Sequence, residues 1–222
     1  MRIPSSKLTT LLAGLAFLSV ATAAQAVPCT TVCYVAPGGL DSNDGDTPGT
    51  AKLTINAAIA AVSPGGTVEV AAGTYNEDVL VNKTITLQGA GSGTTTVSGP
   101  IGGLDGATIR ILASGVVVDG FTITRDGNNP VDWNNGALNF AGVGIQGQTV
   151  NAEVRNCVIA GNRSGIDINN SNGNNIHDNT IDNNHTGVIL RNQTDNTAFV
   201  NNVVTNNRTV GLLFLDASGG TN

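Results

Sequence analysis

Three basic residues recur at the same place in a repeating segment. Arg163, His185 and Arg208 are separated by steps of 22 and 23 residues. If each repeat forms one coil of a stacked structure, these side chains lie on one edge, a coil apart. A guanidinium group forms paired hydrogen bonds with a carboxylate, so this edge is a candidate site for an acidic glycan. The alternative is that all three are solvated turn residues.

A second candidate is the segment inserted between two repeats, residues 127–139. It contains Asp132 and Trp133, the only tryptophan of the chain. Loops inserted into a rigid scaffold often bind ligands, and an indole face can stack on a sugar ring. We therefore consider Trp133 and Asp132 as candidate substrate-binding residues. The alternative is that Trp133 folds down over the side of the coil.

Calcium is the one cofactor that the sequence suggests. Asp41, Asp44 and Asp46 fall within six residues and resemble an acidic cation-binding loop. The segment lacks the spaced glutamate of an EF-hand. A structural turn is therefore the alternative, and the sequence favours it.

Two kinds of catalysis on polysaccharides can be weighed. A lyase needs its substrate carboxylate neutralised, a base and an acid. Because the last lysine is Lys83, arginine or histidine would have to serve among the repeats. A glycoside hydrolase needs two carboxylates about 5–9.5 Å apart. No repeat column pairs two of Asp167, Asp178 and Asp182, which disfavours hydrolysis.

The elements that position these residues form a repeat with a period near 23. One apolar column contains Val118, Val154, Ile176 and Phe199, and a second contains Ile123, Ile159, Ile181 and Val204. Each unit is followed by one corner residue, which is Asp126, Asn162, Asn184 or Asn207. In the later units a glycine and an apolar strand come next. Asparagine and glycine favour tight corners, and stacked coils bury a continuous apolar column. The period predicts an all-β, right-handed parallel β-helix.

The first half of the chain is less regular. Apolar residues at helical spacing predict a helix over 54–62, with Thr54 as its N-cap. Such a helix would cover the open edge of the first coil. Short strands are expected at 67–70, 79–81, 84–87, 95–97 and 109–111.

Composition and termini define the class of protein. The net charge is −6, which argues against nucleic-acid binding. Residues 1–26 have the basic start, apolar stretch and small-residue end of a secretory signal peptide, and no later segment is long enough to span a membrane. Residues 27–222 are expected to form one β-helix domain.

Outside the cytosol a Cys29–Cys33 disulfide is plausible, whereas Cys157 fits a small buried position.

The C-terminal end of the predicted solenoid has no cap. Residues 211–215 begin another apolar strand, and neither a helix nor a polar cap follows. An uncovered edge exposes unpaired backbone groups. We therefore expect a truncated domain, with further C-terminal coils or a partner over this end.

The segments 34–45, 54–59 and 64–75 resemble the opening module of secreted β-helix proteins of the pectin-lyase-like superfamily. The asparagine-rich repeats are similar to the generic repeats of that superfamily, so the resemblance covers nearly all of residues 34–215. This resemblance implies that the chain is a polysaccharide lyase, a glycoside hydrolase, an epimerase or a non-catalytic surface protein. We expect a secreted, periplasmic or cell-surface module that binds extracellular or cell-envelope polysaccharide. A lyase of acidic glycan and a structural or adhesive surface protein are the alternatives.

Overall fold

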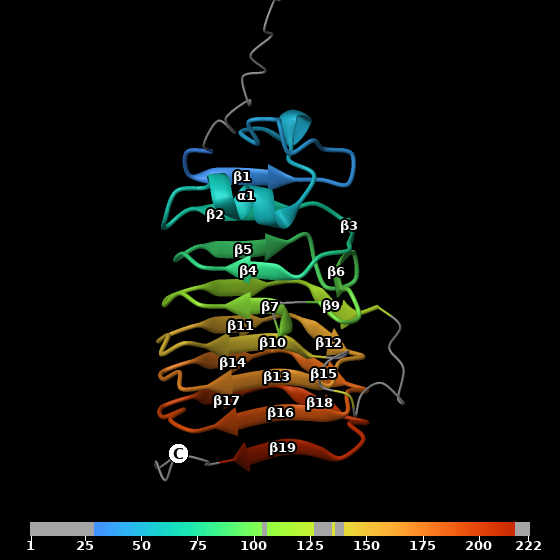
Figure 1. The fold of residues 1–222 in the computed structure, drawn as a ribbon, viewed down its shortest axis with the longest axis vertical. Coiled ribbons are helices and arrows are strands. Elements are labelled where there is room, and N and C mark those ends of the chain that lie inside the picture. Colours follow the sequence, from blue (N-terminus) through green and yellow to red (C-terminus); the bar gives the residue numbers. More distant parts are fainter. Residues whose placement is uncertain (1–28, 104–105, 127–134, 136–139, 216–222) are drawn as a thin grey trace, which may run out of the picture.

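The chain folds into a right-handed parallel β-helix. The computed structural model describes residues 29–103, 106–126, 135 and 140–215. Their strands form three parallel sheets, here called A, B and C, which run along the long axis of the solenoid (Figure 1). From β2 onward, each coil contributes one strand to sheets A, B and C in turn, and β1 adds a further strand to sheet A. The predicted fold class is therefore confirmed.

The strands of a sheet stack in chain order, one above the next. Sheet A contains β1 (Val32–Val35), β2 (Thr67–Val70), β5 (Thr86–Gly89), β8 (Val117–Asp119), β11 (Glu153–Arg155), β14 (Asn175–His177) and β17 (Ala198–Val200). Sheet B contains β3 (Gly73–Tyr75), β6 (Thr95–Gly99), β9 (Thr122–Arg125), β12 (Val158–Ala160), β15 (Thr180–Asp182) and β18 (Val203–Thr205). Sheet C contains β4 (Val79–Val81), β7 (Ala107–Ile111), β10 (Ala141–Gln146), β13 (Ser164–Asn169), β16 (Thr186–Arg191) and β19 (Val210–Leu215).

The register confirms the repeat alignment. Val154 pairs with Val118 and with Ile176 in sheet A. The second apolar column pairs in the same way in sheet B. These side chains face inward, and all but the last coil's are fully buried. A coil cannot bury this column alone, so the stack as a whole supplies the core.

The corner between sheets B and C contains a ladder of buried asparagines. The Asn162 side-chain amide donates to Asn184 Oδ1 at 3.1 Å, and the Asn184 amide donates to Asn207 Oδ1 at 3.1 Å. Gly165 lies beside this ladder. A Cβ added to Gly165 would lie 2.6 Å from the carbonyl oxygen of Gly187, so only glycine allows the coils to approach this closely.

A short helix covers the first coil, as predicted. It is α1 (Ile55–Ala61), and the Thr54 side chain accepts a hydrogen bond from the Ala57 N–H. A 3-10 turn, η1 (Pro48–Thr50), precedes it. Glu77, from the corner before β4, accepts the Ile55 N–H at 2.8 Å. Within the described part of the chain, no helix has the length and apolar character needed to cross a membrane.

The cysteines behave as the sequence suggested. Cys29 and Cys33 form a disulfide beside α1. Cys157 is free and buried in the core, and burial raises its pKa to about 12.

The last coil exposes apolar side chains. Leu212, Phe214 and Leu215 of β19 are 39%, 61% and 46% exposed. The expectation that further coils or a partner cover this edge stays a prediction, as does the division into a signal peptide and one domain. The signal segment 1–26 lies outside the described residues.

Candidate functional site

The structure brings the three basic residues of the repeat together. Arg163, His185 and Arg208 each follow a residue of the asparagine ladder, at the corner between sheets B and C. We call these three residues the basic column. The corner backbone is hydrogen-bonded between coils, with His185 N donating to Asn162 O at 3.0 Å and Arg208 N to Asn184 O at 2.9 Å. The ladder therefore fixes the spacing of the column at one residue per coil.

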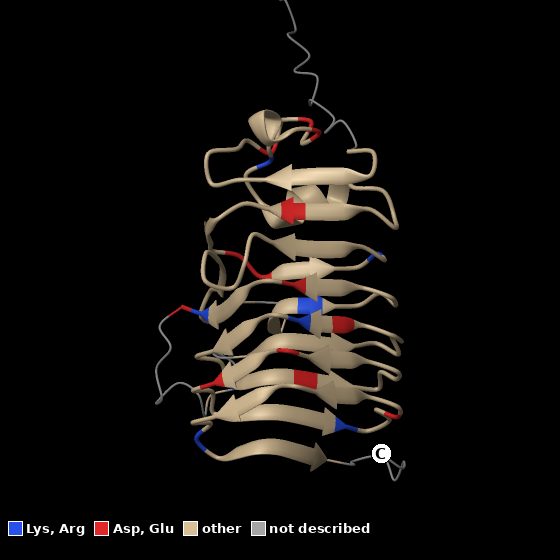
Figure 2. Ribbon diagram, turned by 180° about the vertical axis from the view of Figure 1, so that it is seen from behind, with Lys and Arg blue, Asp and Glu red and all other residues tan. Residues whose placement is uncertain are grey.

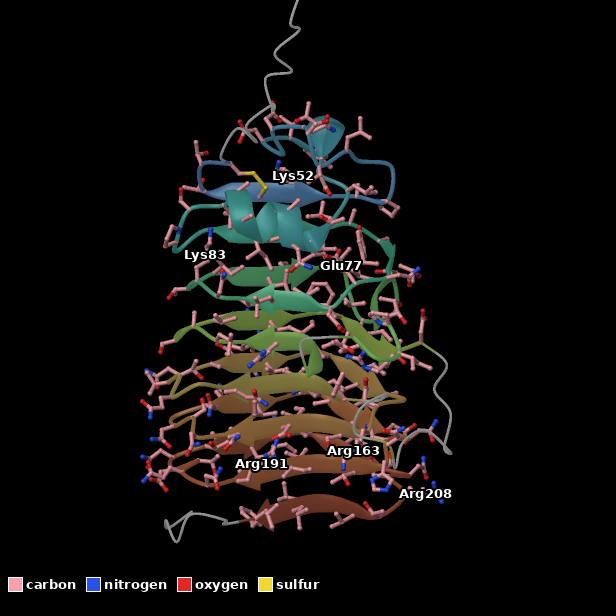
Figure 3. All side chains as sticks on the ribbon, viewed as in Figure 1. Lys52, Glu77, Lys83, Arg163, Arg191 and Arg208 are labelled. Atoms are coloured by element: carbon pink, nitrogen blue, oxygen red, sulfur yellow. A yellow bond between two sulfur atoms is a disulfide. The ribbon has the colours of Figure 1, made fainter. Side chains whose placement is uncertain are left out.

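The basic column presents two guanidinium groups around an imidazole. Arg163 and Arg208 are exposed, whereas His185 is partly buried. In Figure 3 both arginines lie in the lower half of the solenoid. Burial lowers the pKa of His185, and the positive charges of Arg163 and Arg208 lower it further. At neutral pH the column therefore holds a neutral imidazole between two cations.

An ion pair lies on sheet C, on coils that also carry the basic column. Arg191 of β16 binds Asp167 of β13 through two hydrogen bonds of 2.9 and 2.5 Å. Burial raises the pKa of Asp167, while the charges of Arg191 and Arg163 oppose this rise. Arg191 is held by a carboxylate and is only partly exposed, and Arg163 and Arg208 are the exposed arginines of these coils.

The acidic loop lies at the opposite end of the solenoid. Asp41 Oδ1 accepts the Thr54 N–H at 2.8 Å, and Asp41 Oδ2 accepts the Thr54 hydroxyl at 3.0 Å. Asp44 Oδ1 accepts the Asp46 N–H at 3.1 Å. Asp41 thus fixes Thr54, the N-cap residue of α1. This contact supports the interpretation of the loop as a structural turn.

A lysine provides the cation of this loop. The side chain of Lys52 is fully buried, and Figure 3 shows Lys52 in the uppermost coils. Its ammonium donates to Asn43 O at 2.6 Å and to Asp41 O at 3.2 Å. An ammonium group therefore binds two backbone carbonyl oxygens of the loop that contains the calcium candidates Asp41, Asp44 and Asp46.

Two of the sequence-predicted site residues belong to the inserted segment. Trp133 and Asp132 lie outside the described residues, so their roles stay predictions. Most of the solenoid carries no charged side chain, as the back view in Figure 2 shows. The exceptions include a charged cluster on the outer face of sheet A.

The cluster on sheet A joins charged residues of three neighbouring strands, β8, β11 and β14, in one chain of contacts. Arg155 binds Asp119 at 2.8 Å and Glu153 at 2.6 Å. His177 contacts Glu153 through Nε2 at 3.0 Å and Asp178 through Nδ1 at 2.6 Å. Hydrogen bonding to Asp178, and then to Glu153, raises the pKa of His177.

We predict that His177 makes stability depend on pH. The pKa of His177 is higher in the folded than in the unfolded chain, so its protonated form stabilises the fold. This stabilisation is fully present below the unfolded-state pKa of about 6.5 and disappears as the pH rises through the folded-state pKa. The difference in melting temperature between the wild type and His177→Asn is therefore expected to be larger at pH 6 than at pH 9. Thermal unfolding followed by circular dichroism measures it. An equal difference at both pH values would contradict the prediction.

A buried ion pair was missed by the sequence reasoning. Arg125 ends β9, and its side chain is fully buried against Asp78 at 2.9 Å. The guanidinium also donates to Pro100 O and lies 5.2 Å from the centre of the Phe140 ring. Partly exposed and buried residues alternate along β9, so Arg125 lies on the inward face with Ile123. This alternation along the strand could have predicted that the Arg125 side chain is buried. Arg125 and Phe140 flank the inserted segment 127–139.

The donor atoms of the described residues do not form a metal site. No group of three His, Cys, Asp or Glu side chains among them is arranged to hold an ion. The chain has two histidines, three cysteines and one methionine. His177 contacts carboxylates through both ring nitrogens, and His185 lies between two arginines.

Comparison with solved structures supports the fold. The chain is similar to the crystal structure of pectate lyase Pel9A, with a TM-score of 0.67 and 20% identity over 86% of this chain and 52% of that one. A weaker match is pectin methylesterase PemA from Erwinia chrysanthemi, with a TM-score of 0.49 and 13% identity over 72% and 56% of the two chains. The chain thus spans about half the length of these structures.

Sequence comparison gives the family. No curated protein matches the chain significantly. The profile of one family, described as periplasmic copper-binding protein (NosD), matches residues 67–222. This match covers more than half of the chain and includes most of the coils. The chain therefore belongs to the NosD family, a periplasmic family with the parallel β-helix fold.

Proposed function

We propose that the chain is an exported β-helix module that binds an acidic polysaccharide along the basic column. The observation that carries the proposal is the spacing of Arg163, His185 and Arg208, one per coil on one edge. Neighbouring parallel strands lie about 4.8 Å apart, so the column repeats on the scale of a sugar residue. The exposed guanidinium groups suit the carboxylates of an extended uronate chain.

Export is part of this proposal. The signal-like segment 1–26 and the periplasmic description of the family support it. The structural neighbours named for pectin support polysaccharide as the ligand class only by analogy of fold.

Copper, which the family description names, does not fit the donor set of this chain. Copper sites use imidazole, thiolate or thioether ligands. Cys29 and Cys33 are paired in a disulfide, and burial holds Cys157 as a thiol with a pKa of about 12. The two histidines lie on different faces of the coil, in sheet A and at the corner between sheets B and C. We therefore base no step of the proposed function on copper.

The binding proposal predicts a loss of affinity in arginine variants. Each exposed guanidinium is expected to contribute about 1 kcal/mol, which is about five-fold in Kd. Arg163→Ala and Arg208→Ala should each weaken polygalacturonate binding about five-fold, and the double variant about 30-fold. Calorimetry at low salt measures these values, and added salt should weaken wild-type binding.

Arg155→Ala is the matched control, because it removes the same charge from sheet A. It should bind polygalacturonate as the wild type does. Fully methyl-esterified polygalacturonate, which lacks the carboxylates, should bind weakly to every variant. Unchanged affinity in the double variant, or an equal loss in Arg155→Ala, would refute the proposed site.

A lyase is the second candidate function, and the lowered pKa of His185 favours it. A neutral imidazole can accept the C5 proton of a uronate while the arginines neutralise its carboxylate. The C4–O bond then breaks, its electron pair leaves with the oxygen, and the C–H electron pair forms the C4=C5 double bond. A proton from water completes the leaving hydroxyl.

The lyase candidate predicts an unsaturated product that absorbs ultraviolet light. Polygalacturonate and alginate would be incubated with the protein, with and without calcium. The absorbance should rise with the wild type, stay flat with His185→Ala, and rise normally with His177→Ala. A flat trace with folded wild-type protein would reject the lyase and leave binding or a structural role.

A further inference from the structure

A hollow of about 390 Å³ opens on the outer face of sheet A, away from the basic column. Its volume falls within the range of roughly 300–1,000 Å³ typical of small-ligand sites. The first three strands of the sheet form its base, and the segment around Pro48 forms one wall. The lining residues are Tyr34, Val35, Ala36, Pro48, Ala51, Glu69, Val70, Ala71, Gln88, Gly89 and Ala90.

Three polar side chains cross this hollow in register. Tyr34 of β1 pairs with Glu69 of β2, and Glu69 pairs with Gln88 of β5. They therefore come from three successive coils and point outward from strands rather than from loops. Tyr34 and Gln88 are partly exposed, and Glu69 is exposed. Strands hold such side chains more rigidly than loops do.

Small residues make the rest of the hollow apolar. Ala36, Ala71 and Ala90 follow the three strands at the corner toward sheet B, and Gly89 adds no side chain. An apolar surface with few convergent polar groups is the usual composition of a small-ligand site. The phenol ring of Tyr34 adds an aromatic face that is apolar in its body and polar at its tip.

The charges around the hollow exclude an anion. Glu69 is the only charged side chain among the lining residues. The next residue of the same row is Asp119, which pairs in register with Gln88 and is itself bound to Arg155, so it adds no net positive charge beside the hollow. Figure 2 shows little positive charge near the upper strands of this sheet. A uronate would meet repulsion here, in contrast to the basic column.

We propose that this hollow binds an uncharged sugar ring. The apolar C–H face of a pyranose would stack on Tyr34 and the small residues, and its hydroxyl groups would hydrogen-bond to the Glu69 carboxylate and the Gln88 amide. The ligand class is a neutral glycan. The site is independent of the acidic-glycan site proposed above and would recognise a different part of a mixed polysaccharide or a different chain.

The test uses fluorine NMR of protein labelled with 3-fluorotyrosine. The chain has two tyrosines, and the Tyr34→Phe variant assigns the two signals. Galactotetraose, xylotetraose, mannotetraose and cellotetraose are the neutral probes, and tetragalacturonate is the acidic one. At least one neutral probe should shift the Tyr34 signal saturably, whereas tetragalacturonate should leave it unchanged.

Two matched substitutions locate the binding. Ala90→Leu fills the hollow and is expected to weaken the neutral probe about ten-fold or more. Ala198→Leu places the same side chain at an exposed position of β17 and should change the affinity less than two-fold. The proposal is overturned if no neutral probe shifts the Tyr34 signal, if tetragalacturonate shifts it equally, or if Ala90→Leu binds like the wild type. None of these outcomes depends on Arg163 or Arg208.

Discussion

Arg125→Ala is expected to lower the free energy of unfolding by about 3–5 kcal/mol. The substitution leaves the carboxylate of Asp78, only 8% exposed, without the guanidinium that it binds. It also removes the donor to Pro100 O and the cation above the Phe140 ring. A buried charge that loses its partner costs far more than an intact pair contributes. Urea unfolding followed by circular dichroism measures the loss.

Two variants separate the ion pair from other causes. Arg125→Met combined with Asp78→Asn removes both charges and should recover part of the stability lost in Arg125→Ala. Arg155→Met breaks a pair whose arginine side chain is 34% exposed, and should cost about 1 kcal/mol or less. If the double variant is as unstable as Arg125→Ala, loss of the guanidinium from the Asp78 carboxylate is not the cause.

Asn184→Ala is expected to destabilise the chain by about 3 kcal/mol. Its side chain is fully buried and takes part in bonds to two neighbouring coils. Its Oδ1 accepts the Asn162 N–H at 3.0 Å, and its amide donates to Ile159 O at 3.0 Å and to Asn207 Oδ1 at 3.1 Å. Alanine removes the acceptor of the Asn162 N–H and the side-chain donor to Ile159 O, and a buried group left unsatisfied costs about 1–3 kcal/mol.

Asn175→Ala provides the matched control for the ladder. Asn175 is an exposed residue of β14, so its loss should change the free energy of unfolding by less than about 0.5 kcal/mol. Because the basic column follows the ladder, Asn184→Ala should also weaken polygalacturonate binding. Equal stability of the two asparagine variants would show that the ladder does not hold the coils together.

The regular half of the fold could be predicted to the residue. The pairs Val118–Val154 and Ile159–Ile181 follow from aligning apolar residues at a fixed period, because stacked coils repeat the same environment. The first half could be predicted only in part. The strand expected at 84–87 is observed at Thr86–Gly89, since irregular coils give no register to anchor their strands.

For the candidate sites too, only the residues that the repeat relates to one another could be predicted. The grouping of Arg163, His185 and Arg208 follows from the repeat, because their separation is one coil. The Asp78–Arg125 pair joins residues 47 apart, across two coils with unequal loops, and no period relates them. The sequence did not reveal that Lys52 binds in the acidic loop. A lysine ammonium and a metal cation can bind the same carbonyl oxygens, so an acidic loop that holds either one has a similar sequence.

The nearly constant step between paired strands in the last coils has a consequence for how this part of the chain folds. Val154 pairs with Ile176, and Ile176 pairs with Phe199, so successive partners are 22 and 23 residues apart. Relative to the chain length this separation is about 0.1, a contact order typical of small helical bundles rather than of β-sandwiches. In this part of the chain each new coil closes a loop of nearly the same length, so the entropic cost of adding a coil does not grow from one of these coils to the next. Once one coil exists, the solenoid can therefore grow from it in nearly equal steps, with the kinetics of a one-dimensional polymer.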